Sequence, residues 1–577
     1  MLFTLLLIIY AFASYANSPT LNATHQTIGE VWVGEIEFDF LTGLYFFKRG
    51  KDVYLRGAMS DSQQMNGRPV HCSLYNRSRS LCASWFPKVK LEVSRDVEEH
   101  ADCYSLTWSP GLEDYKPHTC FSMADTFWYG GSTFYDQKWP LNKVNLPFQA
   151  YRTRNLQYAD GEMNTVGSVL DWFWINSNGI AVIFDTSVPL HISVNQSGDK
   201  LLCFHSQANP MSDLRYKICK ADNLRKIHRY VMSKFAHLPL QLPKDDIFLQ
   251  PMWTTFPHFH ALNQENLLNY SKDVADKELS SSIMLMNDDA LSLFDPNPFD
   301  KTKFPNSHQS LMYVRSPYGF QPYLAISPFI NASTETVDNR KLMKDNHDKP
   351  VVVNYSGIKC YVIDLLKKET YDWFVEQLKN IKVQFSMDGF YFAGGDMEIL
   401  EFKTQDTSSV DSNIIEQFAK KYSSIAERFS TQTVSSFAVQ SQSSSSVVLL
   451  NSKTSSWTSK GGLKSIIPSV FTLGLLGYPL VAPNCVGGPG IPVTNHTGLG
   501  LPDRELYIRW LAVSAYMPVM AFSHPPWLYD SEVLKITRNY IKIHTDLVAP
   551  IVIKAAREFE ATGLCIHDIK LYIIFNI

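Results

Sequence analysis

Polar residues that directly follow short apolar runs are the candidates for chemistry in this 577-residue chain. Carboxylates occur among them at Asp288, Asp289 and Asp396, and most other positions carry hydroxyl, amide or aromatic groups. Acid and base catalysis needs side chains whose pKa lies near the working pH, which a hydroxyl does not offer. The set therefore has few groups that suit acid and base catalysis. Its members are Trp253-Thr254, Asn287-Asp288-Asp289, Ser327-Pro328, Ala393-Gly394-Gly395-Asp396, Asn451-Ser452-Lys453, Asn484-Cys485 and Ser523-His524.

The apolar runs before these positions alternate, from about residue 244 onward, with amphipathic stretches of ten to eighteen residues. This alternation is typical of β-α units around a parallel sheet. The runs number eight, which is the number that closes a (β/α)8 barrel, where chemistry sits at the strand ends. They are residues 248–253, 283–286, 323–326, 389–392, 436–439, 447–450, 479–482 and 517–522.

The first 240 residues follow a different pattern. Short alternating segments, such as 30–36 (EVWVGEI), are separated by Gly, Pro, Asn and Asp. They predict an antiparallel β-sandwich, so the fold class is α/β, with a sandwich ahead of a TIM barrel. Serine-rich stretches at 404–412 and 441–446 lie inside the barrel pattern and are predicted to be loops. The predicted divisions are a signal peptide over 1–16, the sandwich domain over 17–240, the barrel over 241–565 and an atypical tail over 566–577.

The N-terminus and the glycosylation sequons indicate the secretory pathway. Residues 1–16 have an apolar core followed by Ser14-Tyr15-Ala16, a cleavage pattern typical of a signal peptide. An uncleaved membrane anchor is the alternative, although the run is shorter than the ~20 residues of a membrane span. We therefore expect a protein of the ER, Golgi or lysosome lumen, or a secreted one. The Asn-x-Ser/Thr sequons are Asn22, Asn76, Asn195, Asn269, Asn331, Asn354 and Asn495.

Nine cysteines suit an oxidising lumen. Three pairs are close enough in sequence to close short loops, but the spacing leaves the connectivity open. They are Cys72/Cys82, Cys103/Cys120 and Cys203/Cys219. The remaining Cys360, Cys485 and Cys565 are expected to be buried and unpaired. No CxxC pair and no cluster of His, Cys and carboxylates follows the runs, so we predict neither a metal nor an organic cofactor.

Composition bounds the partners and the number of domains. The formal net charge is -3, and no run of Lys and Arg interleaves with aromatic residues as nucleic-acid binding requires. We therefore expect no nucleic-acid partner. A chain of this length exceeds one hydrophobic core, so two or three domains are expected.

Five stretches carry a recognisable family pattern. They are 127–131 (FWYGG) with 139–140 (WP), 462–465 (GLKS), 475–479 (LLGYP), 504–510 (RELYIRW) and 525–530 (PPWLYD). These stretches resemble glycoside hydrolase family 31, and most closely its myogenesis-regulating glycosidase branch, over roughly residues 30–560. The resemblance implies a β-sandwich, a (β/α)8 barrel and C-terminal β-domains. Residues 570–577 do not resemble the family, so the C-terminal β-domains are expected to be missing.

The resemblance also implies a retaining mechanism, in which one carboxylate attacks the sugar and a second, ~5 Å away, protonates the leaving oxygen. The family's nucleophile falls on Ala393 in 390–396 (FYFAGGD), and its acid/base falls on Ser452, five residues before Trp457. A third family acid, which contacts the sugar after strand seven, corresponds to Asn484. None of these three side chains is a carboxylate, so we expect hydrolysis to be impaired.

Asp396 is the alternative nucleophile, because 395–398 (GDME) resembles the nucleophile motif of other family members. However, a shift of three residues along an extended strand moves a side chain by ~10 Å and turns it to the other face. A loop cap or a solvated position is the other interpretation of Asp396. At the eighth strand end, we expect His524 to be a packing or surface residue rather than a base.

Five residues are expected to bind sugar if the resemblance holds. Asp288 and Asp289 stand where the family holds a sugar hydroxyl, with a turn or helix N-cap role as the alternative. Trp253 is expected either to stack on a sugar face or to pack inside the barrel. Asn484 and Trp457 complete the set.

Three functions remain open on the sequence alone. The first is a glycosidase-fold pseudoenzyme that binds a carbohydrate, a glycoprotein or another protein partner. The second is an active retaining α-glycosidase, α-galactosidase-like as this branch implies, that uses Asp396. The third is a membrane-tethered interaction protein that keeps residues 1–16 as an anchor.

Overall fold

The computed structural model describes most of the chain between residues 28 and 562, and all structural statements below concern that part. Asp289, Asp396, Ser452, Asn22, Asn495 and Cys565 lie outside it. The described ranges are 28–59, 68–111, 115–154, 163–206, 213–236, 241–259, 261–288, 291, 293–333, 338–345, 347–355, 357–395, 412–450, 455–482, 484–492 and 499–562.

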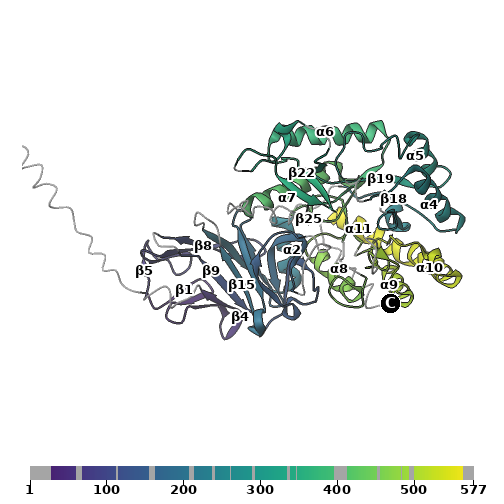
Figure 1. Ribbon diagram of the computed structural model, residues 1–577. Helices are drawn as coiled ribbons and strands as arrows, with labels where there is room; N and C mark the ends of the chain where they lie inside the picture. Colours follow the sequence, from purple (N-terminus) through teal and green to yellow (C-terminus); the bar gives the residue numbers. More distant parts are fainter. Residues whose placement is uncertain are drawn as a thin grey trace, which may run out of the picture.

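Two antiparallel sheets form the N-terminal half, which confirms the predicted β-sandwich (Figure 1). Large aromatic side chains such as Trp108, Trp128 and Trp174 are fully buried in its core. The first sheet runs β1 (Glu30–Val33), β2 (Ile36–Asp39), β3 (Leu44–Arg49), β4 (Asp52–Met59), β9 (His118–Ser122), β15 (Leu201–Ser206), β14 (Leu190–Val194) and β11 (Leu146–Ala150). The second runs β10 (Trp128–Phe134), β12 (Val166–Asn176), β13 (Ile180–Phe184), β16 (Leu214–Lys220), β8 (Asp102–Pro110), β7 (Val89–Val97), β6 (Ser80–Trp85) and β5 (Val70–His71).

A parallel barrel follows the sandwich, as the alternating runs predicted. Its described strands pair in the order β30 (Ala521–Phe522), β17 (Met252–Thr254), β18 (Ile283–Met286), β19 (Gln321–Ile326), β23 (Gly389–Phe392), β24 (Thr433–Ser435), β26 (Val447–Leu449) and β27 (Val481–Ala482). A parallel bridge between Val486, just past β27, and Phe522 of β30 brings the two ends together. The strand ends therefore meet at one face of a nearly closed barrel.

The fifth strand is not where the sequence pattern placed it. The barrel uses β24 (Thr433–Ser435), whereas β25 (Ala438–Val439), within the predicted run 436–439, pairs with β12 of the sandwich. Ala438 and Val439 are buried at the junction of the two units. The apolar pattern therefore predicted their burial correctly but assigned the strand to the wrong sheet. The first run also divides, since α3 (Asp246–Leu249) takes its beginning and the strand starts at Met252.

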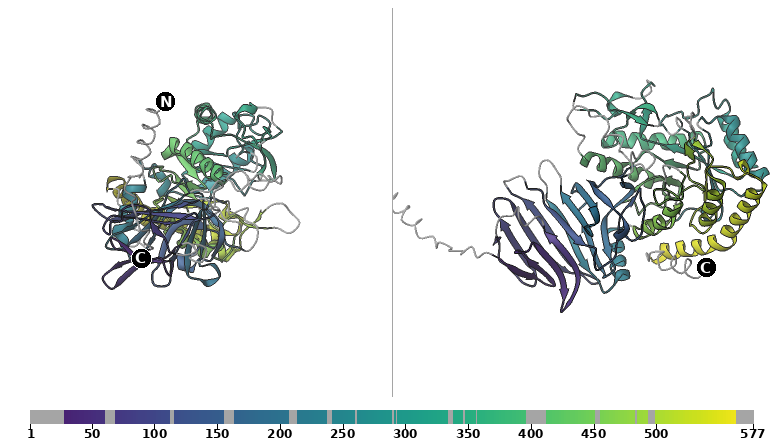
Figure 2. Two further views of the ribbon diagram at one scale, coloured as in Figure 1. Left: turned by 90° about the vertical axis from the view of Figure 1, so that its left-hand side faces the viewer. Right: turned by 60° about the horizontal axis from the view of Figure 1, so that its bottom comes forward.

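Helices lie on the outer side of the barrel in Figure 1 and in the right-hand view of Figure 2. Asparagine or aspartate N-caps begin four of the helices, namely Asn223, Asn263, Asp503 and Asp530, each accepting from a backbone amide of the first turn. None of the described helices is long and apolar enough to cross a membrane. The barrel helices are α4 (Gln264–Asp276), α5 (Ser307–Arg315), α6 (Lys368–Gln384), α7 (Ser412–Phe429), α8 (Ile466–Leu475), α9 (Arg504–Ser514), α10 (Ser531–Ile543) and α11 (Ala549–Thr562). Helix α2 (Leu224–Phe235), which connects the two units, packs on β12 and β13 of the sandwich.

A small antiparallel sheet extends the loop after the third barrel strand. It consists of β20 (Phe329–Asn331), β22 (Ile358–Val362) and β21 (Val352–Tyr355), and its Phe329 ring is fully buried. A second pair, β28 (Ile491–Pro492) and β29 (Leu499–Gly500), lies in the connection from β27 to α9. The stretch 504–510 forms the start of α9 (Arg504–Ser514), in which Glu505 and Arg509 are paired at 2.7 Å.

Three disulfides lie in the sandwich, as a protein of the secretory pathway would have. Cys72–Cys82 is one of the pairs that the spacing allowed, whereas the other two close pairs, Cys103/Cys120 and Cys203/Cys219, do not form. Cys103 on β8 bonds Cys219 on β16, and Cys120 on β9 bonds Cys203 on β15. Each of these pairs stands directly opposite on adjacent antiparallel strands, so strand order decides the connectivity. Cys360 and Cys485 are buried and unpaired, as expected.

Candidate functional site

The end of the fourth barrel strand is closely packed. Ala393 directly follows β23, is 7% exposed, and donates its backbone amide to Ile326 O at 2.8 Å. The next two residues are glycines that lie against aromatic rings. A Cβ added at Gly394 would meet Phe329 Cε2 at 2.7 Å, and one added at Gly395 would meet Phe437 Cζ at 2.3 Å. The segment that the resemblance aligns with a catalytic nucleophile therefore begins as close backbone packing between two rings.

Asp288 lies at the end of β18 and is 3% exposed. One carboxylate oxygen accepts the backbone amide of Leu262 at 2.7 Å, and the other accepts the amide of Leu291. The carboxylate thus ties the loop after β17 to the loop after β18, which is the turn role considered as the alternative. A carboxylate has about four acceptor positions, so a sugar hydroxyl at Asp288 stays a prediction.

Trp253 on β17 is fully buried. Its ring stacks on Phe522 of β30 at 4.6 Å between centroids, and its indole nitrogen donates to Ser280 O at 3.1 Å. These contacts correspond to the packing alternative for Trp253, because the ring offers no exposed face to a sugar.

Trp457 differs from Trp253, since 46% of its surface is exposed. It lies in the loop after β26, close in sequence to Ser455, whose hydroxyl donates to Gly487 O and accepts the Gly490 amide at 2.9 Å. This loop is therefore held against the segment that follows β27. An exposed indole in a positioned loop is suited to stacking on a sugar ring.

The seventh and eighth strand ends carry an amide and an imidazole. Asn484 is 8% exposed, and its side-chain oxygen accepts the amide of Cys485 at 2.8 Å. His524 is buried, which fits the packing expectation, but its Nε2 has no hydrogen-bond partner among the described residues. Burial, with a smaller contribution from the nearby His258, lowers the pKa of His524 to about 4, although a backbone hydrogen bond to Pro489 opposes the shift. His524 is thus a neutral imidazole at neutral pH.

A second orphan polar atom lies at the third strand end. Ser327 directly follows β19, is fully buried, and its hydroxyl has no partner among the described residues. Buried polar groups are nearly always hydrogen-bonded, so Ser327 Oγ and His524 Nε2 are two buried polar atoms that suit a hydroxyl of a ligand. The sequence pattern predicted a binding role for neither residue, although Ser327 directly follows the run 323–326 and His524 lies two residues past the run 517–522.

Carboxylates are scarce across these strand ends. Among the described residues that follow the eight strands, Asp288 is the one carboxylate, and both of its oxygens accept backbone amides. Ser452, Asp289 and Asp396 lie outside the described residues, so their predicted roles stay predictions. In the described part of the chain, no three His, Cys, Asp or Glu side chains gather as metal ligands would.

The sequons that the structure describes are all at least partly accessible. Asn76, Asn269 and Asn354 are exposed, while Asn195 and Asn331 are half-buried. Accessible asparagines are compatible with attached glycans, and their modification stays a prediction.

Both halves of the chain match models of known protein domains. Residues 247–551 match the model of the glycosyl hydrolases family 31 TIM-barrel domain, and residues 46–217 match the myogenesis-regulating glycosidase N-terminal domain. The chain is 28% identical over 488 residues to myogenesis-regulating glycosidase of Mus musculus, covering 80% of this chain and 66% of the mouse protein. It is 27% identical over 507 residues to the SITS-binding protein of Tetronarce californica, covering 85% of this chain and 70% of that protein. The chain therefore spans about two thirds of the length of these relatives.

Solved structures share the fold at low sequence identity. A family 31 sulfoquinovosidase from E. rectale superposes with a TM-score of 0.69 at 14% identity, covering 94% of this chain and 82% of that one. A family 31 dextranase from Flavobacterium johnsoniae superposes with a TM-score of 0.62 at 13% identity, covering 94% and 71%. At this identity the likeness concerns the fold alone.

Proposed function

The chain belongs to glycosyl hydrolase family 31, and on that premise we propose that it is a glycosidase-fold protein with impaired hydrolysis that binds a glycan or glycoprotein at the barrel's strand ends. The observation that carries this proposal is Ala393 at the end of β23, where the family resemblance places the nucleophile. A methyl group has no nucleophilic atom, and the packing of Gly394 and Gly395 against rings supports a loop built for close contact.

Retaining hydrolysis also needs a second carboxylate as acid and base. The described strand ends offer Asp288 alone, already bound by two backbone amides. Ser452 at the acid/base position and Asn484 at the third family position add two further losses, neither of which supplies a group with a suitable pKa. The proposal therefore rests on three positions on three different strands.

Binding without hydrolysis is supported by a separate set of atoms. Ser327 Oγ and His524 Nε2 are buried and unpartnered at two strand ends, and each suits a sugar hydroxyl. Trp457 adds an exposed indole in the loop that follows β26. Hydroxyl partners beside an aromatic ring are what a sugar ring requires of a binding site.

The test measures hydrolysis and binding on the same purified protein. Aryl α-galactoside, α-glucoside and α-xyloside are the substrates, and a thermal-shift screen against free sugars reports binding. The screen also includes SITS, since the Tetronarce relative is named for binding it. Asp396→Ala tests the alternative nucleophile, and Asp300→Ala, an exposed loop carboxylate, is the matched control.

We expect no hydrolysis by any of the three proteins, with sugar-dependent stabilisation of all of them. Hydrolysis abolished by Asp396→Ala but kept by Asp300→Ala would make the chain an active α-glycosidase. If the protein hydrolyses no substrate and no sugar stabilises it, the glycan-binding proposal is refuted. A protein partner then remains as the ligand class.

We further propose a location in the lumen of the secretory pathway or outside the cell. The sandwich disulfides support it, because such bonds persist in oxidising compartments. Intact-mass analysis of the expressed protein tests whether residues 1–16 are removed. Retention of this segment would favour the membrane-tethered alternative.

A further inference from the structure

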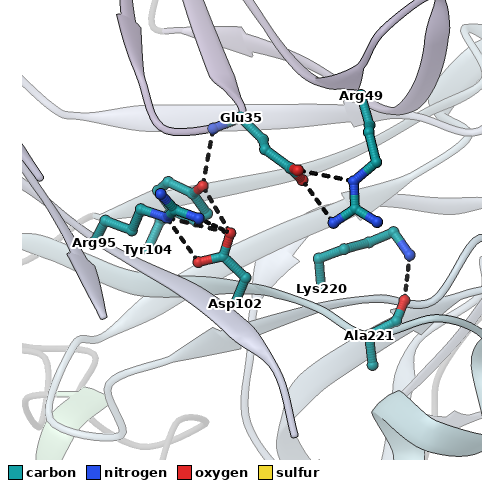
Figure 3. Close-up of polar contacts among 7 residues, drawn as sticks. All are labelled: Glu35, Arg49, Arg95, Asp102, Tyr104, Lys220 and Ala221. Atoms are coloured by element: carbon teal, nitrogen blue, oxygen red, sulfur yellow. Dashed lines mark hydrogen bonds and ion pairs between the residues drawn. The ribbon is translucent and has the colours of Figure 1, made fainter. Parts of the chain in front are cut away.

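A cluster of charged residues lies at one end of the sandwich, remote in sequence from the barrel (Figure 3). It joins the turn between β1 and β2, the end of β3, and strands β7, β8 and β16. Glu35 accepts from Arg49 at 2.8 and 3.4 Å, and Asp102 accepts from Arg95 at 2.7 Å. Tyr104 also donates to Asp102, at 3.0 Å. Both carboxylates of the cluster are therefore already bound by an arginine.

Lys220 is the remaining cation of this cluster. It is the last residue of β16 and is 7% exposed. Its amine donates to the backbone oxygen of Ala221 and lies 4.5 Å from the centre of the Tyr54 ring. Among the described residues, no carboxylate lies within 4.0 Å of this amine. A buried ammonium is costly unless an anion accompanies it.

The nearby carboxylates cannot pair with Lys220 without leaving their own cations unpaired. Glu35 is held by Arg49, and Asp222, two residues after Lys220, is paired with Lys226 at 2.5 Å. The cluster in Figure 3 thus contains three cations, Arg49, Arg95 and Lys220, and two carboxylates, an excess of one positive charge. Burial lowers the pKa of Lys220, and the nearby Arg49 lowers it further, while Asp222 and Glu35 oppose the shift.

Arg49 and Lys220, which interact electrostatically, each keep N–H groups that no described residue accepts. Figure 3 shows the Lys220 amine pointing toward the Arg49 guanidinium. Arg49 binds Glu35 through Nε and Nη2, which leaves Nη1 for another acceptor. Lys220 uses one of its three N–H groups on Ala221. Two cations side by side with free donors repel each other unless an anion lies between them.

We propose that Lys220 and Arg49 form a binding site for an oxyanion, meaning a sulfate, phosphate or carboxylate group. The anion accepts from Lys220 Nζ and Arg49 Nη1, and the neighbouring Tyr54 ring covers the amine. Charge-assisted bonds of this kind are the strong class of hydrogen bonds, and they neutralise the one uncompensated charge of the cluster. The site is independent of the barrel and of its proposed function.

Calorimetric titration of the full chain with inorganic sulfate tests the site, with sodium chloride at matched ionic strength as the blank. We expect saturable binding of sulfate that Lys220→Met weakens by about tenfold or more. Lys51→Met is the matched control, because Lys51 is an exposed lysine of the neighbouring turn, and it should bind as the parent does. Glucose 6-sulfate is titrated in parallel. If it binds more tightly than inorganic sulfate, the ligand is a sulfated sugar; if the two bind equally, the ligand is the free ion.

The parent protein alone supplies a second test if Lys220→Met does not fold. Sulfate keeps its charge between pH 7 and 10, whereas the Lys220 amine, whose pKa is lowered, loses its proton as the pH rises. The pKa of Arg49 is raised by Glu35, and the pKa of Tyr104 is raised by burial, so neither group titrates first. Sulfate affinity should therefore fall with rising pH. No saturable sulfate binding, an affinity constant over this range, or an unchanged affinity in Lys220→Met would overturn the proposal.

Discussion

The side-chain amide of Gln442, in the barrel, donates a hydrogen bond to the carboxylate of Asp171, on strand β12 of the sandwich. Asp171 is 6% exposed, and its other oxygen accepts the amide of Trp172 at 2.9 Å. Burial raises the pKa of Asp171 to about 7. A titrating carboxyl group thus lies within the contact that joins the two units.

Asp171→Asn should make stability less dependent on pH. The pKa of Asp171 is raised in the folded state, so its contribution is full below the unfolded value of 3.8 and is lost as the pH rises through about 7. We expect the parent to lose about 2–4 kcal/mol from this group between pH 4 and 8, and the variant to lose less. Burial also raises the pKa of Glu416 to about 7, so the stability of the variant should keep a residual dependence on pH. Denaturant unfolding at pH 4 and pH 8 measures the change in the free energy of unfolding, with the exposed Asp125→Asn as control. An equal change in the parent and in Asp171→Asn would contradict the prediction.

Gly395→Ala should destabilise the chain by about 1–3 kcal/mol. Its Cβ would meet the Phe437 ring at 2.3 Å, and the ring is buried and cannot swing into solvent. Gly29→Ala is the control, since its nearest neighbours lie 4.0 Å away. The free energies of unfolding of the two variants provide the comparison. An equal effect of both substitutions would mean that the loop after β23 is looser than its contacts indicate.

Ala393→Asp should not restore hydrolysis, because a nucleophile without a second carboxylate completes no catalytic pair. The buried position should also cost about 2–4 kcal/mol of stability when it carries a charge. Ala393→Asn, of similar shape and no charge, is the control. Release of aryl alcohol from an α-glycoside by Ala393→Asp, but not by Ala393→Asn, would show that the rest of the machinery is intact.

Removing the Cys103–Cys219 bond should destabilise the sandwich more than removing Cys72–Cys82. The bonds close loops of 116 and 10 residues, which by the chain-entropy estimate correspond to about 5 and about 3 kcal/mol. Paired serine substitutions compared by denaturant unfolding measure the difference. Peptide mapping without reduction should find Cys103 joined to Cys219, and a peptide joining Cys103 to Cys120 would refute the assignment.

Acid should destabilise the sandwich through a row of histidines. His191, His205 and His118 stand opposite one another on β14, β15 and β9, and burial lowers the pKa of His191 and of His205 to about 4. Because these values lie below the unfolded 6.5, the contribution is full above pH 6.5 and is lost as the pH falls through 4.

The charges that face this row strengthen the effect. Arg152 and Lys116 oppose protonation of His191, and His118 and His191 oppose protonation of His205. His205→Gln should therefore flatten the fall in melting temperature between pH 6.5 and 4. An identical fall in parent and variant would place the acid sensitivity elsewhere.

Sequence patterns alone determined the architecture. Alternation of period two before residue 240 and apolar runs separated by helical stretches after it predicted a sandwich followed by a barrel. Seven of the eight runs overlap their barrel strands, as 389–392 does with β23. These patterns report local burial, which the chain expresses at each residue. The absence of carboxylate at Ala393 was also visible in the sequence, because it is a matter of residue type.

Partners between distant residues were decided by the tertiary structure. Spacing left the partner of Cys103 open, with Cys120 as the near candidate, and strand order put Cys219, 116 residues away, opposite it. An apolar pattern at Ala438 and Val439 could not say whether the barrel or the sandwich buries them. The excess charge at Lys220 likewise appears only when five strands and turns meet, since a single sequence records each side chain but not its neighbours in space.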